Sequence, residues 1–177
     1  MRVHKKSLLG VFAVIGVFAA VILLARGFGV FYNDTPSIPE GFWYSTSKPC
    51  PELVDFVAAC PPIPAAKLAL ERDYLPAGRC PSGTVPLLKR VYATPFDLVR
   101  IEGGTLSIQH GEIAITHSIN VMKTDPEGRP LTQALGGVLS ASQYWLGSPC
   151  PIGFDSRYFG AVQRQNIISV IRPLFTW

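Results

Sequence analysis

The sequence lacks the motifs by which most cofactor and metal sites are recognised. It contains no glycine-rich phosphate-binding loop, no pair of Cys-x-x-Cys motifs and no His-Glu-x-x-His helix. His110 and His117 belong to no recognisable ligand pattern, and the four cysteines are irregularly spaced. We therefore expect neither a cofactor nor a bound metal ion.

The main part of the chain also lacks an excess of charge. The formal net charge is +4, but Arg2, Lys5 and Lys6 precede a long apolar run, and residues 26–177 carry 13 basic and 12 acidic side chains. A protein that binds nucleic acid needs a basic face. The near-neutral balance therefore argues against a nucleic-acid partner.

One uncharged stretch is long enough to cross a membrane. Residues 8–25 are 18 residues without a charge, and as a helix they would span roughly 27 Å. The basic residues 1–7 would then be a cytoplasmic tail and residues 26–177 a periplasmic domain. A cleaved signal peptide is the alternative, but its apolar region is usually about 7 to 15 residues long. We favour an uncleaved, single-pass anchor in a bacterial inner membrane.

The four cysteines all lie in the exported part of the chain, where oxidation is permitted: Cys50, Cys60, Cys80 and Cys150. Two disulfides are expected, and the sequence does not select among the three ways of pairing four cysteines. We expect Cys50 with Cys60 and Cys80 with Cys150, because the second bond would tie together two of the candidate catalytic regions described below.

A change of pattern divides the exported domain. Residues 48–86 contain half of the 16 prolines and three of the four cysteines, so we expect an insertion without central strands. Within it, Pro51–Ala59 and Pro64–Tyr74 are predicted to be short helices with proline in the first turn. Strands are predicted beyond it at 85–92, 98–101, 105–109, 113–119, 142–146 and 157–162. A mainly β fold follows, a curved antiparallel sheet or small barrel.

Ser37 is the candidate nucleophile. It lies in the segment Asn33–Trp43, where Pro36 and Pro39 restrict the backbone and Gly41 permits conformations that strain other residues. The pattern therefore predicts a rigid loop that presents one serine. On this segment alone, a simple linker next to the membrane is the alternative.

Lys89 is the candidate general base. Strand alternation places it on the same face as Leu87 and Val91. If that face is buried, the apolar surroundings would lower the lysine pKa from about 10.4 towards 7 or 8, and the neutral amine could take the proton of Ser37. The alternative is an ordinary, half-exposed strand lysine.

Three segments in this order resemble the type I signal peptidase family of serine-lysine endopeptidases. They are a Ser-x-Pro just beyond the apolar run, Leu88–Val91, and the run Asp155–Gly160 with the sequence Asp-Ser-Arg-Tyr-Phe-Gly. The opening Asn-x-Thr-x-Ser-x-Pro-x-Gly, at residues 33 to 41, is similar to the conjugative-transfer branch of that family, the TraF peptidases. The resemblance implies a signal-peptidase-like fold and covers most of the chain up to residue 162.

The resemblance also implies roles for single residues. Ser37 would be the nucleophile, Lys89 the general base and Asp155 the acid that supports them, while Thr35 and the backbone N–H of Ser37 would form the oxyanion hole. A carboxylate close to Lys89 would raise its pKa and oppose its role as a base. We therefore expect Asp155 to pair with Arg157 and to orient the site.

Two departures from the family pattern concern the surroundings of Lys89. The usual Gly-Asp-Asn ahead of the last motif is replaced by Gly147-Ser148-Pro149. In the wider family a serine approaches the lysine from the position that corresponds to Gly153. The groups around Lys89 should therefore differ from those of a housekeeping signal peptidase.

The position of Ser37, 12 residues beyond Ala25, predicts an active site close to the membrane and substrates that are membrane-bound or newly exported. The resemblance implies maturation of a membrane-bound conjugative pilin precursor through an acyl-enzyme, with hydrolysis or cyclisation as its outcome, and association with a conjugation apparatus. A general signal peptidase and a catalytically silent component of a conjugation or export channel are the alternatives.

Overall fold

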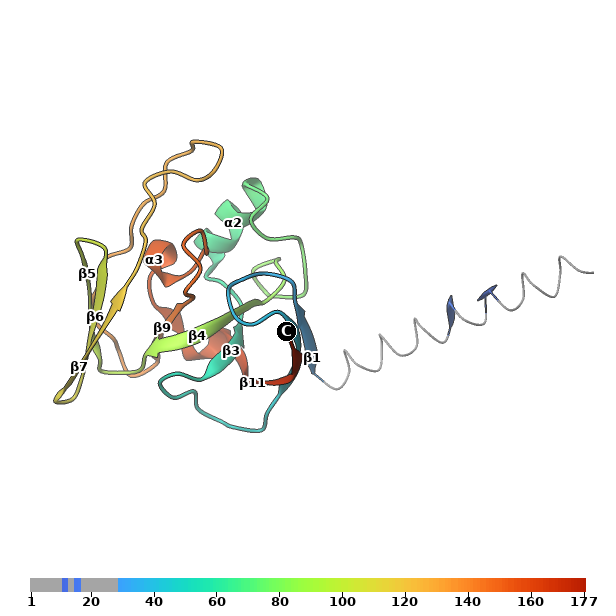
Figure 1. The fold of residues 1–177 in the computed structure, drawn as a ribbon, viewed down its shortest axis with the longest axis horizontal. Helices are drawn as coiled ribbons and strands as arrows, with labels where there is room; N and C mark the ends of the chain where they lie inside the picture. Colours follow the sequence, from blue (N-terminus) through green and yellow to red (C-terminus); the bar gives the residue numbers. More distant parts are fainter. Residues whose placement is uncertain (1–10, 13–14, 17–28) are drawn as a thin grey trace, which may run out of the picture.

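The computed structural model describes residues 11–12, 15–16 and 29–177 (Figure 1). The predicted cytoplasmic tail and most of the predicted anchor, residues 8–25, lie outside the described residues, so both stay predictions. Within the part that is described, no helix has the length and apolar character needed to span a membrane.

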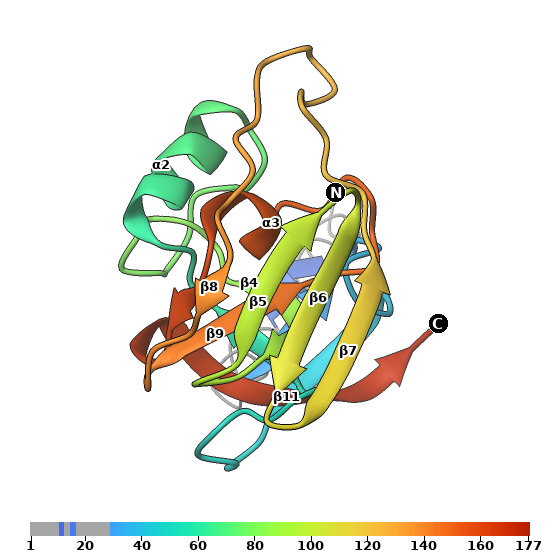
Figure 2. The same ribbon diagram turned by 90° about the vertical axis from the view of Figure 1, so that its left-hand side faces the viewer.

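Two antiparallel sheets form the described domain, as Figures 1 and 2 show. The larger sheet has the strand order β1-β2-β11-β3-β4-β9-β10 and the smaller one β7-β6-β5-β8. The strands of the larger sheet are β1 (Val30–Asn33), β2 (Gly41–Ser45), β3 (Phe56–Ala59), β4 (Leu87–Ala93), β9 (Gln143–Gly147), β10 (Val162–Gln163) and β11 (Ile167–Thr176). Those of the smaller sheet are β5 (Leu98–Glu102), β6 (Thr105–His110), β7 (Ile113–Ser118) and β8 (Gly137–Val138). The predicted mainly β, antiparallel architecture is confirmed.

Buried apolar side chains join the sheets and support the candidate loop. Trp145 of β9 packs with Val99 of β5 and Leu106 of β6, which connects the two sheets. A separate cluster contains Ile38, Trp43, Ala58, Leu88 and Ile171. Because Ile38 directly follows Ser37, this second cluster anchors the serine loop on the larger sheet.

The predicted helix at Pro51–Ala59 is wrong, and so is the absence of central strands from residues 48–86. Phe56–Ala59 form β3, which lies between β11 and β4 in the middle of the larger sheet. The four residues are uninterrupted apolar side chains without proline, which suits a strand with two covered faces. The prolines that dominate this region lie outside the strand. The second predicted helix is present as α2 (Ile63–Glu71), with Pro64 in its first turn.

The predicted pairing of the cysteines is also wrong. The structure contains one disulfide, between Cys60 and Cys80, while Cys50 is an exposed thiol and Cys150 a buried one. Cys60 follows β3 directly, and α2 then reverses the chain so that Cys80 returns beside it. Cys150 follows β9, which lies on the opposite side of β4 from β3. Sheet order, which sequence spacing does not reveal, therefore decides the pairing.

The carboxy-terminal strand β11 pairs with both β2 and β3. Ile167, Val170 and Ile171 are buried in the sheet, whereas Phe175 and Trp177 are exposed. The end of the strand runs beside the serine loop, because Thr176 pairs with Gly41 and the Trp177 N–H donates to the Glu40 carbonyl at 3.1 Å (Figure 1). The carboxy terminus thus helps to position the candidate nucleophile.

Candidate active site

The loop that carries Ser37 connects β1 to β2 and is held by the side chain of Asn33. This residue is buried, and its amide donates to the carbonyl oxygens of Thr35 at 2.8 Å and Ile38 at 2.9 Å. The indole of Trp43 donates to the Pro39 carbonyl at 3.0 Å. The loop is therefore rigid for a further reason besides its prolines, since side chains bind the backbone groups that the turn leaves unpaired. Asn33 opens the Asn-x-Thr-x-Ser-x-Pro-x-Gly motif, but the sequence alone gave no role for its side chain.

Gly41 ends the loop in a conformation that favours glycine. Its φ is +132°, and a β-carbon at this position would overlap the backbone carbonyl of Phe175 in β11. Any larger residue would push β2 away from β11 and change the path of the serine loop.

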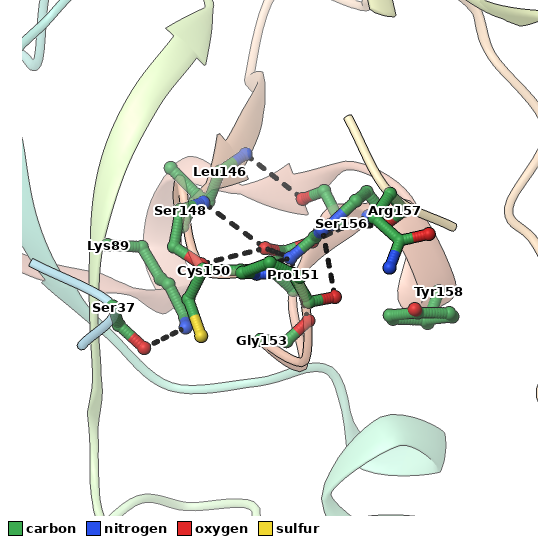
Figure 3. Close-up of polar contacts among 12 residues, drawn as sticks. Ser37, Lys89, Leu146, Ser148, Cys150, Pro151, Gly153, Ser156, Arg157 and Tyr158 are labelled. Atoms are coloured by element: carbon green, nitrogen blue, oxygen red, sulfur yellow. Dashed lines mark hydrogen bonds and ion pairs between the residues drawn. The ribbon is translucent and has the colours of Figure 1, made fainter. Parts of the chain in front are cut away.

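Ser37 and Lys89 meet in a buried contact, as Figure 3 shows. The Lys89 Nζ donates to the Ser37 Oγ at 2.7 Å, and the two residues are only 3% and 9% exposed. Lys89 comes from the middle of β4, 52 residues from the serine, where it pairs with Val57 of β3. As strand alternation predicted, Leu87 and Val91 are buried on the same face.

Burial changes the chemistry of this lysine. Loss of solvation lowers the pKa of Lys89 from 10.5 to about 8, while the Asp155 carboxylate acts to raise it and the Arg157 guanidinium to lower it. A lysine with this pKa is about one-tenth neutral at pH 7, far more than a solvated lysine, and its neutral amine can accept a proton from a hydroxyl within hydrogen-bond distance.

Asp155 and Arg157 form a fully buried, bidentate ion pair. The Arg157 Nε donates to Asp155 Oδ1 at 2.8 Å, and its Nη2 donates to Oδ2 at 2.8 Å. The guanidinium also donates to the carbonyl oxygens of Asn120, Cys150 and Gly153 at 2.8 to 2.9 Å. These contacts gather the loop after β9 around one charged group. In the part of the chain that the structure describes, no carboxylate lies within 4.0 Å of the Lys89 nitrogen.

The predicted strand at 157–162 is wrong for most of its length. Residues Ser156–Phe159 form the short helix α3, and the strand β10 begins only at Val162. The Asp155 carboxylate accepts from the Arg157 N–H at 3.0 Å and caps the helix, and Gly160, with a φ of +75°, ends it. Asp155 and Arg157 therefore meet at the first turn of a helix instead of along a strand face.

Thr35, the predicted oxyanion donor, is exposed near Ser37. Its hydroxyl donates to Asn33 Oδ1 at 2.9 Å. Its role in the oxyanion hole stays a prediction.

A cleft of about 1210 Å³ lies beside Ser37 and Lys89 and is lined mainly by apolar residues. One wall consists of residues 29–37, including β1, which is an edge strand of the larger sheet. Further lining comes from residues 74–79, from residues 85–89, from the loop around Met122 and Leu131, and from the loop of residues 150–154. Ser37 and Lys89 both line this cleft, so a bound molecule would have access to the serine.

Known proteins resemble the chain over most of its length. A family model described as signal peptidase, peptidase S26, matches residues 4–176. A plasmid transfer protein TraF of Escherichia coli is 36% identical over 172 residues, with 94% of this chain and 95% of the relative covered. A conjugal transfer protein TraF of Agrobacterium fabrum (strain C58) is 36% identical over 171 residues, with 96% and 94% covered. A solved signal peptidase I of Enterococcus faecalis V583 superposes with a TM-score of 0.40 at 20% identity, covering 68% of this chain and 96% of that one.

Proposed function

The chain belongs to the S26 family of signal peptidases, and on that premise we propose that it is a membrane-anchored serine endopeptidase that matures a conjugative pilin precursor. The observation that carries the proposal is the 2.7 Å hydrogen bond between the Lys89 amine and the Ser37 hydroxyl in a buried site. A nucleophile and a base within hydrogen-bond reach are the minimum for acyl transfer.

Acylation begins when neutral Lys89 accepts the proton of Ser37 and the Oγ attacks the scissile carbonyl carbon. The ammonium that results gives its proton to the nitrogen of the leaving peptide, and the acyl group remains on Ser37 as an ester. The pKa of about 8 for Lys89 suits both steps, because the same group has to act as base and then as acid.

The negative charge that develops on the attacked carbonyl oxygen needs hydrogen-bond donors. The backbone N–H of Ser37 is one candidate. The Thr35 hydroxyl is the other, and it would have to turn away from Asn33 Oδ1, which it contacts at 2.9 Å in the free enzyme. Asn33 would then hold the loop while the Thr35 hydroxyl donates a hydrogen bond to the carbonyl oxygen of the substrate.

The Asp155–Arg157 pair positions the loop beside Lys89 without preventing the lysine from acting as a base. Its opposite charges act on the Lys89 pKa in opposite directions, so the two effects partly cancel. The main contribution of the pair is to hold the loop of residues 147–155 beside Lys89 through the carbonyl contacts of Arg157. Asp155 is thus a positioning residue.

The acyl-enzyme has two possible fates. Water activated by Lys89 would hydrolyse the ester to a linear product. An amine of the same substrate that reaches the ester first would form a peptide bond and close a ring. The two relatives are named for plasmid transfer and conjugal transfer. These names support a pilin of a conjugation apparatus as the substrate.

The cleft supports an extended peptide as the substrate. Its wall includes the edge strand β1, whose free backbone groups can pair with an added strand. Ser37 follows the predicted anchor by 12 residues, so a precursor embedded in the same inner membrane is within reach from the periplasmic side.

The test is the intact mass of a candidate pilin precursor co-expressed with the full chain. Wild type is compared with Ser37→Ala and with Ser107→Ala, a control serine in β6. We expect a shortened product with wild type and Ser107→Ala only, and a mass lower by one further water if the product is cyclic.

An unchanged precursor in all three samples would remove pilin as the substrate. If other exported precursors also stayed intact, the protein would be a silent component of the channel. Accumulation of many exported precursors after depletion of the protein would instead identify a general signal peptidase.

A further inference from the structure

The lysine in the candidate site has too few hydrogen-bond acceptors for its charged form. The one hydrogen bond that Lys89 Nζ makes within the described part of the chain is the contact with Ser37. After Lys89 takes the serine proton it is an ammonium with three donors, and it is only 3% exposed. A buried ammonium with unpaired N–H groups is unfavourable. The acylation step therefore needs a second acceptor near this nitrogen.

The Asp155 carboxylate does not fill this role directly. Its Oδ1 accepts from the backbone N–H and the Nε of Arg157, and its Oδ2 accepts from the Arg157 Nη2. The side that remains is occupied by Ser148, whose backbone N–H lies 3.2 Å and whose hydroxyl lies 3.4 Å from Oδ2. Ser148 therefore adjoins the carboxylate on a side that Arg157 does not cover.

Ser148 adjoins the Asp155 carboxylate on the side of the loop that Figure 3 shows towards Lys89. It follows the end of β9 and is 3% exposed. Figure 3 shows the side chains of Ser148 and Cys150 on the side of the loop that faces Lys89, with the Cys150 sulfur next to the Lys89 nitrogen. A thiol is a weak acceptor, so the Ser148 hydroxyl is the better partner for an ammonium.

Gly153 makes room for this hydroxyl. A β-carbon at position 153 would overlap the Ser148 Oγ, and it would lie 3.0 Å from the Arg157 Nη2. The Ser148 hydroxyl thus fills the space that a side chain at 153 would enter. A serine at position 153 could place its hydroxyl in the same space only if Ser148 were replaced by a smaller residue.

We propose that Ser148 is a positioning residue for Lys89, whose hydroxyl donates to Asp155 and accepts a hydrogen bond from the lysine ammonium during acylation. The proposal rests on the proposed function, because it requires Lys89 to act as the base for Ser37. It links Asp155 to Lys89 through one buried hydroxyl, without direct contact between the two charges.

The proposal predicts the direction of a pH effect. The titratable and charged groups that act on Lys89 are Asp155, Arg157 and Cys150. An acceptor that bonds the ammonium favours the charged form and raises the pKa of Lys89. Loss of the Ser148 hydroxyl should therefore lower that pKa further. A loosened loop that merely admits water would instead relieve the burial and raise the pKa towards 10.5.

The experiment measures acylation of Ser37 by the nitrophenyl ester of acetyl-alanine, followed by intact mass from pH 5.5 to pH 9.5 in the full-length protein. We expect Ser148→Ala to be acylated about three- to tenfold more slowly on the alkaline plateau. We also expect the midpoint of its pH profile to move to lower pH by about one unit.

Ser156→Ala is the matched control. Ser156 is also buried, at the start of α3, but its hydroxyl accepts from the Leu146 N–H at 3.0 Å. This variant should lose stability while keeping the wild-type midpoint. The double variant Ser148→Ala/Gly153→Ser returns a hydroxyl to the same space and should recover rate and midpoint, whereas Gly153→Ser alone introduces an overlap.

Each outcome separates the two proposals. A midpoint of Ser148→Ala that stays in place or moves to higher pH overturns the role of Ser148, and so does a folded double variant that remains as slow as Ser148→Ala. Acylation of wild type that is unchanged in Ser37→Ala would refute the proposed function itself, and the role of Ser148 with it.

Discussion

Replacement of Lys89 by methionine should make the protein more stable at neutral pH although it removes the proposed base. The pKa of Lys89 falls from 10.5 to about 8 because burial disfavours the ammonium. At 1.36 kcal/mol for each pKa unit, this corresponds to roughly 3 kcal/mol of folding free energy that wild type loses at pH 7. Lys89→Met removes this penalty, and it also removes the hydrogen bond to Ser37, which contributes about 1 kcal/mol. The net expectation is a gain of about 2 kcal/mol.

The effect has a defined pH dependence. Below pH 8 the lysine is charged in the folded and the unfolded state, and the whole penalty applies. Between pH 8 and 10.5 the folded state releases its proton first, so wild type becomes more stable as the pH rises. The advantage of Lys89→Met should therefore shrink by about 2 kcal/mol between pH 7 and pH 9.5.

Urea unfolding of the full-length protein in detergent, followed by tryptophan fluorescence, provides the measurement. Lys67→Met is the matched control, since its side chain is 78% exposed on α2 and no burial penalty applies to it. An advantage of Lys89→Met that is absent at pH 7, or that stays constant up to pH 9.5, would show that Lys89 is solvated in solution and would refute the reasoning.

Three further predictions concern the acylation of Ser37, the Asp155–Arg157 ion pair and the Cys60–Cys80 disulfide. Acylation of Ser37 should rise with pH and reach half of its maximum near pH 8, because neutral Lys89 is the reactive form; a midpoint near 10.5 in the pH profile would contradict this. Asp155→Asn should destabilise the fold by about 3 to 5 kcal/mol in denaturant titrations, since it leaves the buried Arg157 charge unpaired, and the double variant Asp155→Asn/Arg157→Met should recover part of the loss. Replacement of Cys60 and Cys80 by serine should cost about 3 kcal/mol of unfolding free energy, as expected for a closed loop of 20 residues, whereas Cys50→Ser should have no measurable effect in the same titration.

Much of the smaller sheet could be predicted from local patterns. The strands β5, β6 and β7 lie within one residue of the predicted ranges, because Gly103, Gly104 and Gly111 adopt positive φ in the turns between them. Alternation in β4 likewise placed Lys89 on the face of Leu87 and Val91. Turn chemistry and period-two patterns are local properties, so a single sequence carries them.

Other features could not be predicted from local sequence patterns, because residues far away in the sequence determine them. Phe56–Ala59 is a strand because β11 and β4 offer it two edges to pair with. Residues after Asp155 turn into α3 because that carboxylate caps the helix while it holds Arg157. The sequence does not show which side chains or strands surround these two segments. In a sequence alone, for example, an aspartate that caps a helix cannot be distinguished from one that forms an ion pair.

The sequence by itself determined the mainly β fold, the order of the three motifs and the candidate serine-lysine pair, because motif order and periodicity are properties of the linear chain. Only the tertiary structure decided that Lys89 reaches Ser37 across 52 residues, that Cys60 pairs with Cys80, and that Ser148 occupies the space above Gly153. The physical reason is that hydrogen bonds, disulfides and desolvation depend on distances of a few ångströms between segments that sheet pairing brings together.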